Sequence, residues 1–265
     1  MEKMRFLKLF LLVCFMSILT ECQKVINIDL NSASPQTVVQ GNLFSFGGLS
    51  GDSVQLSQTV NFSEPNSFPP ITDALVIISD NAGNIDTLPE TGSGIYTSSK
   101  IKDIPGRTYS LYISANGKTY TSISTMPAPV NIDTIYVQKS IFGKNLQITV
   151  KWTDPAGIPN YYRLIKKINN TISTADYVTD DELEDGKVIT FPLFGGDNDS
   201  LRVGDSVRVY LESIDKGAYD YFISLDDASG SPGDVAPANP QSNISNNALG
   251  YFSAGSITSK SIIVP

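Results

Sequence analysis

The feature that most constrains the fold is a series of short segments in which apolar and polar residues alternate. The segments recur about every ten residues and are separated by turns rich in Gly, Asn, Asp and Pro. Alternation places apolar side chains on one face of a strand, and closely spaced turns are typical of antiparallel sandwiches. The pattern predicts an all-β protein made of two β-sandwich modules.

The first module is expected to cover residues 37–126. Within it, Asn116-Gly117 lies between two alternating segments. This dipeptide predicts a type I′ hairpin, because both central positions of that turn need positive φ. Two prolines then interrupt strand pairing, so residues 127–131 are expected to form a linker.

The second module is expected to cover residues 132–265. Asn145 to Trp152 alternates and Tyr161 to Ile168 returns as its partner, a pairing that resembles a fibronectin III or immunoglobulin-like sandwich. Asp215 predicts the start of one short helix, because the apolar residues after it fall at helical spacing. The stretch 229–247 is rich in Ser, Pro, Gly and Asn and predicts a long loop.

The N-terminus has the pattern of an export signal. Positive charge in the first five residues precedes an apolar run from Phe6 to Leu19, which is too short to span a bilayer. The run ends in Leu19-Thr20-Glu21-Cys22, which resembles the lipobox of bacterial lipoproteins, although Glu21 replaces a small residue. We expect a signal peptide over 1–21, a lipid on Cys22 and a tether over 22–36. An uncleaved anchor is the alternative.

Composition excludes several classes of function. The chain has 27 acidic and 19 basic residues, and such a surface repels nucleic acid. It has no histidine, which removes Ser-His-Asp and Cys-His catalysis and the usual zinc ligands. Because Cys14 lies in the predicted signal, no disulfide is expected in the mature chain. We therefore expect a protein that is not an enzyme and holds no cofactor, with calcium the one candidate ion.

Several segments together resemble a family of Bacteroidetes lipoproteins grouped as domain of unknown function 4249. They are Cys22 to Leu30, Val38 to Gly41, Asp154-Pro155 with Tyr161 to Arg163, and Leu249 to Phe252. The first module is also similar to carboxypeptidase regulatory-like and transthyretin-like sandwiches, at Gly94 to Tyr96 and Gly106 to Tyr109. The resemblance implies an outer-membrane lipoprotein that occurs beside TonB-dependent transporters. It implies no established activity.

Acidic loops are the candidates for metal or sugar chemistry. Asp197 and Asp199 alternate within Gly195 to Ser200, a spacing that suits the oxygen ligands of calcium but lacks the other residues of an EF-hand loop. The densest cluster, from Asp180 to Asp185, is interpreted as a solvated turn. A pair of catalytic carboxylates is the alternative for that cluster.

Two sets of residues are candidates for ligand or partner contact. Trp152, with Tyr161 and Tyr162, could stack on a sugar ring, although a Trp at the end of an alternating strand more often belongs to a sandwich core. The end of the long loop is the other candidate, because ligand residues concentrate on loops. Its candidate residues are Asn243, Asn246, Asn247, Tyr251 and Phe252.

Five Asp-Ser/Thr-apolar sequences resemble the sequon of Bacteroidetes O-glycosylation. An Asp in a turn before a strand gives the same pattern without any modification. The hydroxyl residues concerned are Ser53, Thr87, Thr134, Ser200 and Ser206.

The sequence thus predicts a non-enzymatic outer-membrane lipoprotein that assists, or presents ligand to, a TonB-dependent transporter. The alternative is an independent lipoprotein that binds carbohydrate or a calcium-dependent ligand. Either face of the outer membrane is compatible with Gln23-Lys24-Val25 after the lipidated cysteine.

Overall fold

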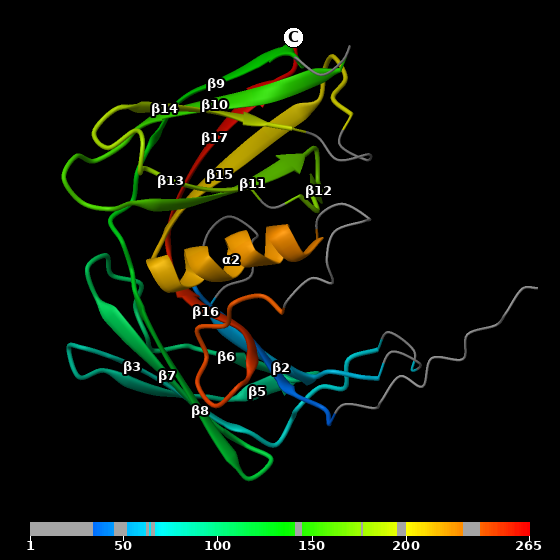
Figure 1. The fold of residues 1–265 in the computed structure, drawn as a ribbon, viewed down its shortest axis with the longest axis vertical. Coiled ribbons are helices and arrows are strands. Elements are labelled where there is room, and N and C mark those ends of the chain that lie inside the picture. Colours follow the sequence, from blue (N-terminus) through cyan, green and yellow to red (C-terminus); the bar gives the residue numbers. More distant parts are fainter. Residues whose placement is uncertain are drawn as a thin grey trace, which may run out of the picture. The chain divides into compact units, whose positions relative to one another are not determined.

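The structure is a computed structural model that describes residues 34–44, 52–61, 64, 67–140, 145–175, 177–194, 200–229 and 239–265. The described residues belong to one compact unit, Ser34–Pro265, and contain seventeen strands and one helix (Figure 1). Among them, no helix has the length and apolar character needed to cross a membrane. The predicted signal peptide, Cys22 and most of the tether lie outside the described residues.

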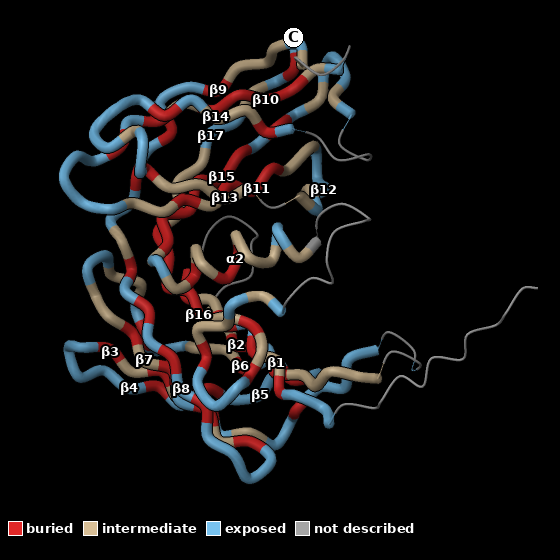
Figure 2. The backbone as a smooth tube through the Cα atoms, in the orientation of Figure 1, coloured by how far each residue is buried: buried red, intermediate tan, exposed pale blue. Residues whose placement is uncertain are grey.

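The first sandwich packs two sheets on one apolar core. One sheet has the order β16 (Leu249–Ala254), β1 (Thr37–Leu43), β2 (Ser53–Gln58), β6 (Ile95–Thr97) and β5 (Glu90–Gly92), and the other β4 (Ile85–Leu88), β3 (Leu75–Asp80), β7 (Thr108–Ala115) and β8 (Lys118–Thr125). Alternate residues of β7 are buried, as period two requires (Figure 2). Asn116 and Gly117 have φ of 51° and 71°, so the hairpin prediction is confirmed.

Strand β16 corrects the predicted division of the chain. The sequence places Leu249 to Ala254 in the second module, but β16 pairs parallel to β1, with Phe252 opposite Gly41. Phe252 and Ala254 are buried in the first core. The second predicted module is therefore interrupted by a strand of the first sandwich. The sequence could not predict this, because the apolar pattern of a short strand does not show which sheet it joins.

The second sandwich contains the remaining strands and a second core. One sheet is β14 (Val188–Leu193), β10 (Leu146–Thr153) and β9 (Ile132–Lys139), and the other is β12 (Thr171–Ile172), β11 (Tyr161–Ile168), β15 (Ser206–Ile214) and β17 (Ser256–Ile263), with β13 (Tyr177–Asp180) also paired to β11. The fold is all-β with two sandwiches and one helix, as the sequence predicts.

Helix α2 (Lys216–Ser229) follows β15. The Ala218 N–H donates to Asp215 Oδ1 at 3.0 Å, which confirms Asp215 as the N-cap. Phe222 is buried, and its ring centroid lies 4.1 Å from the Arg163 guanidinium of β11. The contact between Phe222 and Arg163 packs the middle of the helix against β11.

Candidate functional site

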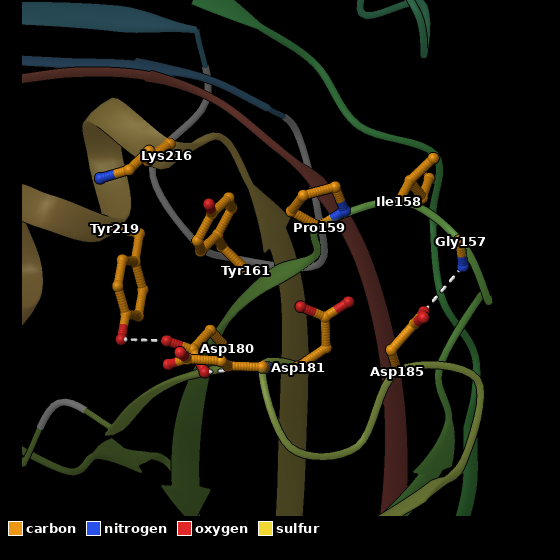
Figure 3. A pocket seen from close by; sticks show the side chains of 10 residues that line it. Gly157, Ile158, Pro159, Tyr161, Asp180, Asp181, Asp185, Lys216 and Tyr219 are labelled. Atoms are coloured by element: carbon orange, nitrogen blue, oxygen red, sulfur yellow. Dashed lines mark hydrogen bonds between the residues drawn. The ribbon is translucent and has the colours of Figure 1, made fainter.

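A pocket of about 560 Å³ lies where two turns of the second sandwich meet the start of α2. One turn follows β10, and the other follows β13 (Figure 3). The lining residues are Gly157, Ile158, Pro159, Tyr161, Asp180, Asp181, Glu182, Asp185, Lys216 and Tyr219. Its volume falls within the range of small-molecule sites.

Strand pairing and the helix together position one wall of the pocket. Tyr161 and Asp180 are register partners in the β11–β13 pair. Tyr219 comes from the first turns of α2, and its ring centroid lies 4.9 Å from that of Tyr161 at 37°. The Tyr219 hydroxyl donates to Asp180 Oδ2 at 2.8 Å. Burial, and then the Asp180 carboxylate, raise the pKa of Tyr219, so this hydroxyl keeps its proton.

Three carboxylates converge beside this wall. Asp154, Asp181 and Asp185 each offer one oxygen, and these oxygens lie within 4.8 Å of one another. Asp154 is held by two donors: the Tyr162 hydroxyl at 2.5 Å and the Gly186 N–H at 3.0 Å. Such a group of oxygens suits a positive charge, whether a metal ion or the charged end of a larger ligand.

Asp181 overturns part of the interpretation of the Asp180 to Asp185 cluster. A turn is present, and the Glu182 N–H donates to Asp180 Oδ1 at 3.2 Å. However, Asp181 is only 5% exposed, so the turn is not solvated along its whole length. The turn packs against the chain after β10 and buries Asp181 between them.

Gly186 allows the two turns to approach closely. Its φ is +69°, and a Cβ at this position would lie 2.7 Å from Ala156 Cβ. The Gly157 N–H donates to Asp185 Oδ1 at 2.7 Å across the same contact. The close approach brings Asp154 and Asp185, which are distant in sequence, to one place.

Lys216 is the cation among the ten lining residues. Its Nζ donates to both carboxylate oxygens of Asp220, at 2.7 and 2.6 Å. This hydrogen bond with Asp220 raises the pKa of Lys216. Its charge is therefore already balanced by a residue outside the pocket lining.

The structure corrects the prediction that Trp152 binds a ligand. Trp152 is fully buried in the second core, and its ring packs against Tyr162 at 5.2 Å and Phe191 at 6.4 Å. Tyr162 is fully buried too. A buried ring cannot stack on a sugar, so of the three predicted aromatic residues only Tyr161 reaches the pocket.

The predicted contact residues of the long loop have structural roles as well. Asn243 bonds the backbone of Phe252 through both side-chain atoms, at 2.8 and 2.9 Å. Asn246 Nδ2 donates to the Thr119 carbonyl at 3.2 Å, and both Asn246 and Asn247 have positive φ. Phe252 is buried, and Tyr251 packs on α2. None of these residues lines the pocket. Asn243 and Asn246 instead fasten the end of the loop to β16 and β8.

The remaining predicted sites have different outcomes. Asp197 and Asp199, the predicted calcium ligands, lie outside the described residues. The hydroxyl residues Thr87, Thr134, Ser200 and Ser206 are exposed, whereas Ser53 is partly buried. The aspartate before Thr87 is buried and accepts hydrogen bonds from Ser98, Ser99 and Lys100. This aspartate therefore has a structural role of its own, and glycosylation at the five hydroxyl residues stays a prediction.

Comparison with protein families identifies the chain. The family described as "Domain of unknown function (DUF4249)" matches residues 23–261. The chain belongs to this family. No curated protein matches this DUF4249 chain.

Two solved structures are similar to the DUF4249 chain. One is a two-fibronectin-type-III segment of chicken tenascin, with 14% identity and a TM-score of 0.25, covering 89% of this chain and 98% of that one. The other is a cytokine receptor complex, with 11% identity and a TM-score of 0.24, covering 84% of this chain and 94% of that one.

The pocket of the DUF4249 chain could not be predicted from its sequence. The lining residues Asp181 and Tyr219, and the neighbouring Asp154, come from three separate segments, and no local motif joins them. The density of acids from Asp180 to Asp185 is the one local signal. It did not reveal that Asp154 faces the same point.

Proposed function

We propose that this protein is a non-enzymatic binding protein that takes a small ligand in the pocket beside α2. The pocket carries the proposal: its volume is about 560 Å³, and it combines tyrosine rings with carboxylates. Its lining includes no cysteine or serine nucleophile, and the chain has no histidine to serve as a base. Recognition of a ligand is the chemistry that this lining supports best.

Ligand-observed NMR tests the pocket. The protein would be screened against neutral saccharides, organic cations and divalent cations, as wild type and as Tyr219→Ala. We expect one class to bind and the variant to lose that binding, because the Tyr219 ring forms part of the wall. Tyr112→Ala, at a 39% exposed position on β7, is the control. Thermal unfolding would verify that both variants fold. Absence of binding in all three classes would contradict the proposal.

We propose further that the protein is lipidated at Cys22, resides at the outer membrane and presents its ligand to a TonB-dependent transporter. The lipobox-like N-terminus and the family resemblance support this setting. Affinity purification from native membranes, after cross-linking, tests it, and a TonB-dependent transporter should be recovered. If none is recovered and the pocket still binds ligand, the protein acts independently.

An independent carbohydrate- or calcium-dependent binding protein is the second candidate. The Tyr161 and Tyr219 rings favour a sugar, since pyranose rings stack on aromatic side chains, and the three converging carboxylates favour calcium. The same screen distinguishes these ligands by class.

A further inference from the structure

The charge balance of the pocket is the starting observation. Four lining residues are acidic: Asp180, Asp181, Glu182 and Asp185. The lining cation, Lys216, is 2.6 Å from Asp220 and therefore contributes little net positive charge to the pocket. Such a pocket attracts cations and disfavours anions.

Asp181 is the residue at which the excess of negative charge in the pocket is most clearly unbalanced. It is 5% exposed, and Figure 3 shows its carboxylate pointing toward Pro159, another residue that lines the pocket. Its Oδ2 accepts a hydrogen bond from Asn160 Nδ2 at 3.3 Å. Within the described residues, its Oδ1 accepts none and no cation pairs with it. A buried carboxylate without a charged partner is costly, so a ligand that brings positive charge gains by pairing with it.

The neighbouring carboxylates strengthen this preference. Oxygens of Asp154 and Asp185 lie within 4.8 Å of an Asp181 oxygen. Asp154 is fixed by Tyr162 and Gly186, and Asp185 is fixed by the Gly157 N–H. The three groups are therefore held close despite their like charges, and a positive charge between them would relieve the repulsion.

The rest of the pocket lining is aromatic and apolar, and the pocket volume is larger than a bound metal ion requires. The Tyr161 and Tyr219 rings lie 4.9 Å apart, and Pro159 and Ile158 add apolar surface to the pocket lining. Rings of this kind bind alkyl chains and attract cations through their faces. A volume of about 560 Å³ leaves room for a molecule with an apolar part beside its charge.

We propose that the pocket binds an organic cation, with an alkylammonium or guanidinium group at Asp181 and Asp185 and an apolar stem against Tyr161 and Tyr219. This inference rests on the proposed binding function and names its ligand class. The guanidinium form would place its planar donors on two carboxylates.

Isothermal titration calorimetry with matched probes tests the inference. N-acetyl-arginine amide is compared with N-acetyl-citrulline amide, which has the same length but no charge, and n-butylammonium serves as an ammonium probe. We expect the cations to bind and the citrulline compound to bind at least roughly tenfold more weakly. Added salt should weaken binding of the cations only.

Aspartate variants test which carboxylates of the pocket bind the cation. Asp181→Asn and Asp185→Asn should each lower affinity for the arginine compound roughly tenfold. Glu184→Gln is the matched control, because it removes the same charge from the same turn but Glu184 does not line the pocket. Asp185 is exposed, so its variant should fold even if Asp181→Asn does not.

The other outcomes separate the two proposals. Equal binding of the arginine and citrulline compounds, or binding of neutral saccharides alone, would overturn the cation class and leave the binding function standing. Binding of Ca²⁺ alone, lost in both aspartate variants, would instead identify a metal site. Failure of all these probes, together with the saccharide screen, would overturn both proposals.

Discussion

Gly41 of β1 and Phe252 of β16 are register partners, and a Cβ on Gly41 would lie 2.8 Å from Phe252 Cδ2. Phe252 is fully buried, so its ring has little space into which to move. Because Gly41 has no side chain, β1 leaves room for Phe252 of β16, a strand from the C-terminal part of the chain. The close packing of β16 on β1 at this point therefore requires glycine at position 41.

Gly41→Ala is expected to lower the free energy of unfolding by about 1–3 kcal/mol, because the added methyl overpacks a filled core. Urea denaturation measures the loss. The double variant Gly41→Ala with Phe252→Leu supplies the control. It should be more stable than the sum of the two single losses predicts, since the smaller side chain accommodates the methyl. Strict additivity would contradict the proposed collision.

The comparison of Asn116-Gly117 and Asp215 with β16 shows which parts of the fold could be predicted. The hairpin turn and the helix cap are local, because each is decided by residues within a few positions of one another. The pairing of β16 with β1 joins residues about two hundred positions apart. Alternation fixes which face of such a strand is apolar but not which sheet edge it meets.

The pocket shows the same limit. The acids from Asp180 to Asp185 were visible as a cluster, but the burial of Asp181 depends on the turn after β10. The sequence also leaves open whether Trp152 binds a ligand or belongs to the core, because the pattern of an alternating strand does not show which aromatic residues reach the surface. Its full burial decides the question.

Tyr162→Phe is expected to destabilise the protein by about 1–3 kcal/mol. The change removes the 2.5 Å donor to Asp154 Oδ1 and leaves a buried carboxylate oxygen without this partner. Chemical denaturation checks the loss. Tyr112→Phe removes a hydroxyl from a 39% exposed residue and should have almost no effect. Equal, small effects would mean that water replaces the lost donor at Asp154.

Gly186→Ala is expected to cost about 1–3 kcal/mol and to weaken any ligand bound in the pocket. The residue would be strained at φ +69° and its methyl would meet Ala156. Gly204→Ala is the matched control, since Gly204 has φ +92° and nothing within 4 Å of the added Cβ. The excess loss at position 186 over position 204 measures the contact between the turns. No excess would mean that the turns separate at little cost.

The carboxyl groups of Asp52 and Asp103 give the first sandwich a dependence on pH. Burial, then the charge of Asp103 and a hydrogen bond with it, raise the pKa of Asp52 to about 7, against the opposing backbone N–H of Phe44. The folded state therefore holds one more proton than the unfolded state between about pH 4 and pH 7. The stability that this proton supplies is complete below pH 4 and is lost as pH rises through 7.

Asp52→Asn should remove this loss, because the amide is uncharged at every pH and can still bond to Asp103. Relative to wild type, the variant is expected to gain on the order of 1–2 kcal/mol between pH 5 and pH 8, a figure that allows for solvent screening of carboxyls that are only partly buried. Urea denaturation at the two pH values measures the change. Asp73→Asn, at an exposed position, is the control for the loss of one charge. If the difference between Asp52→Asn and wild type is the same at both pH values, the pKa of Asp52 is not raised in the folded protein.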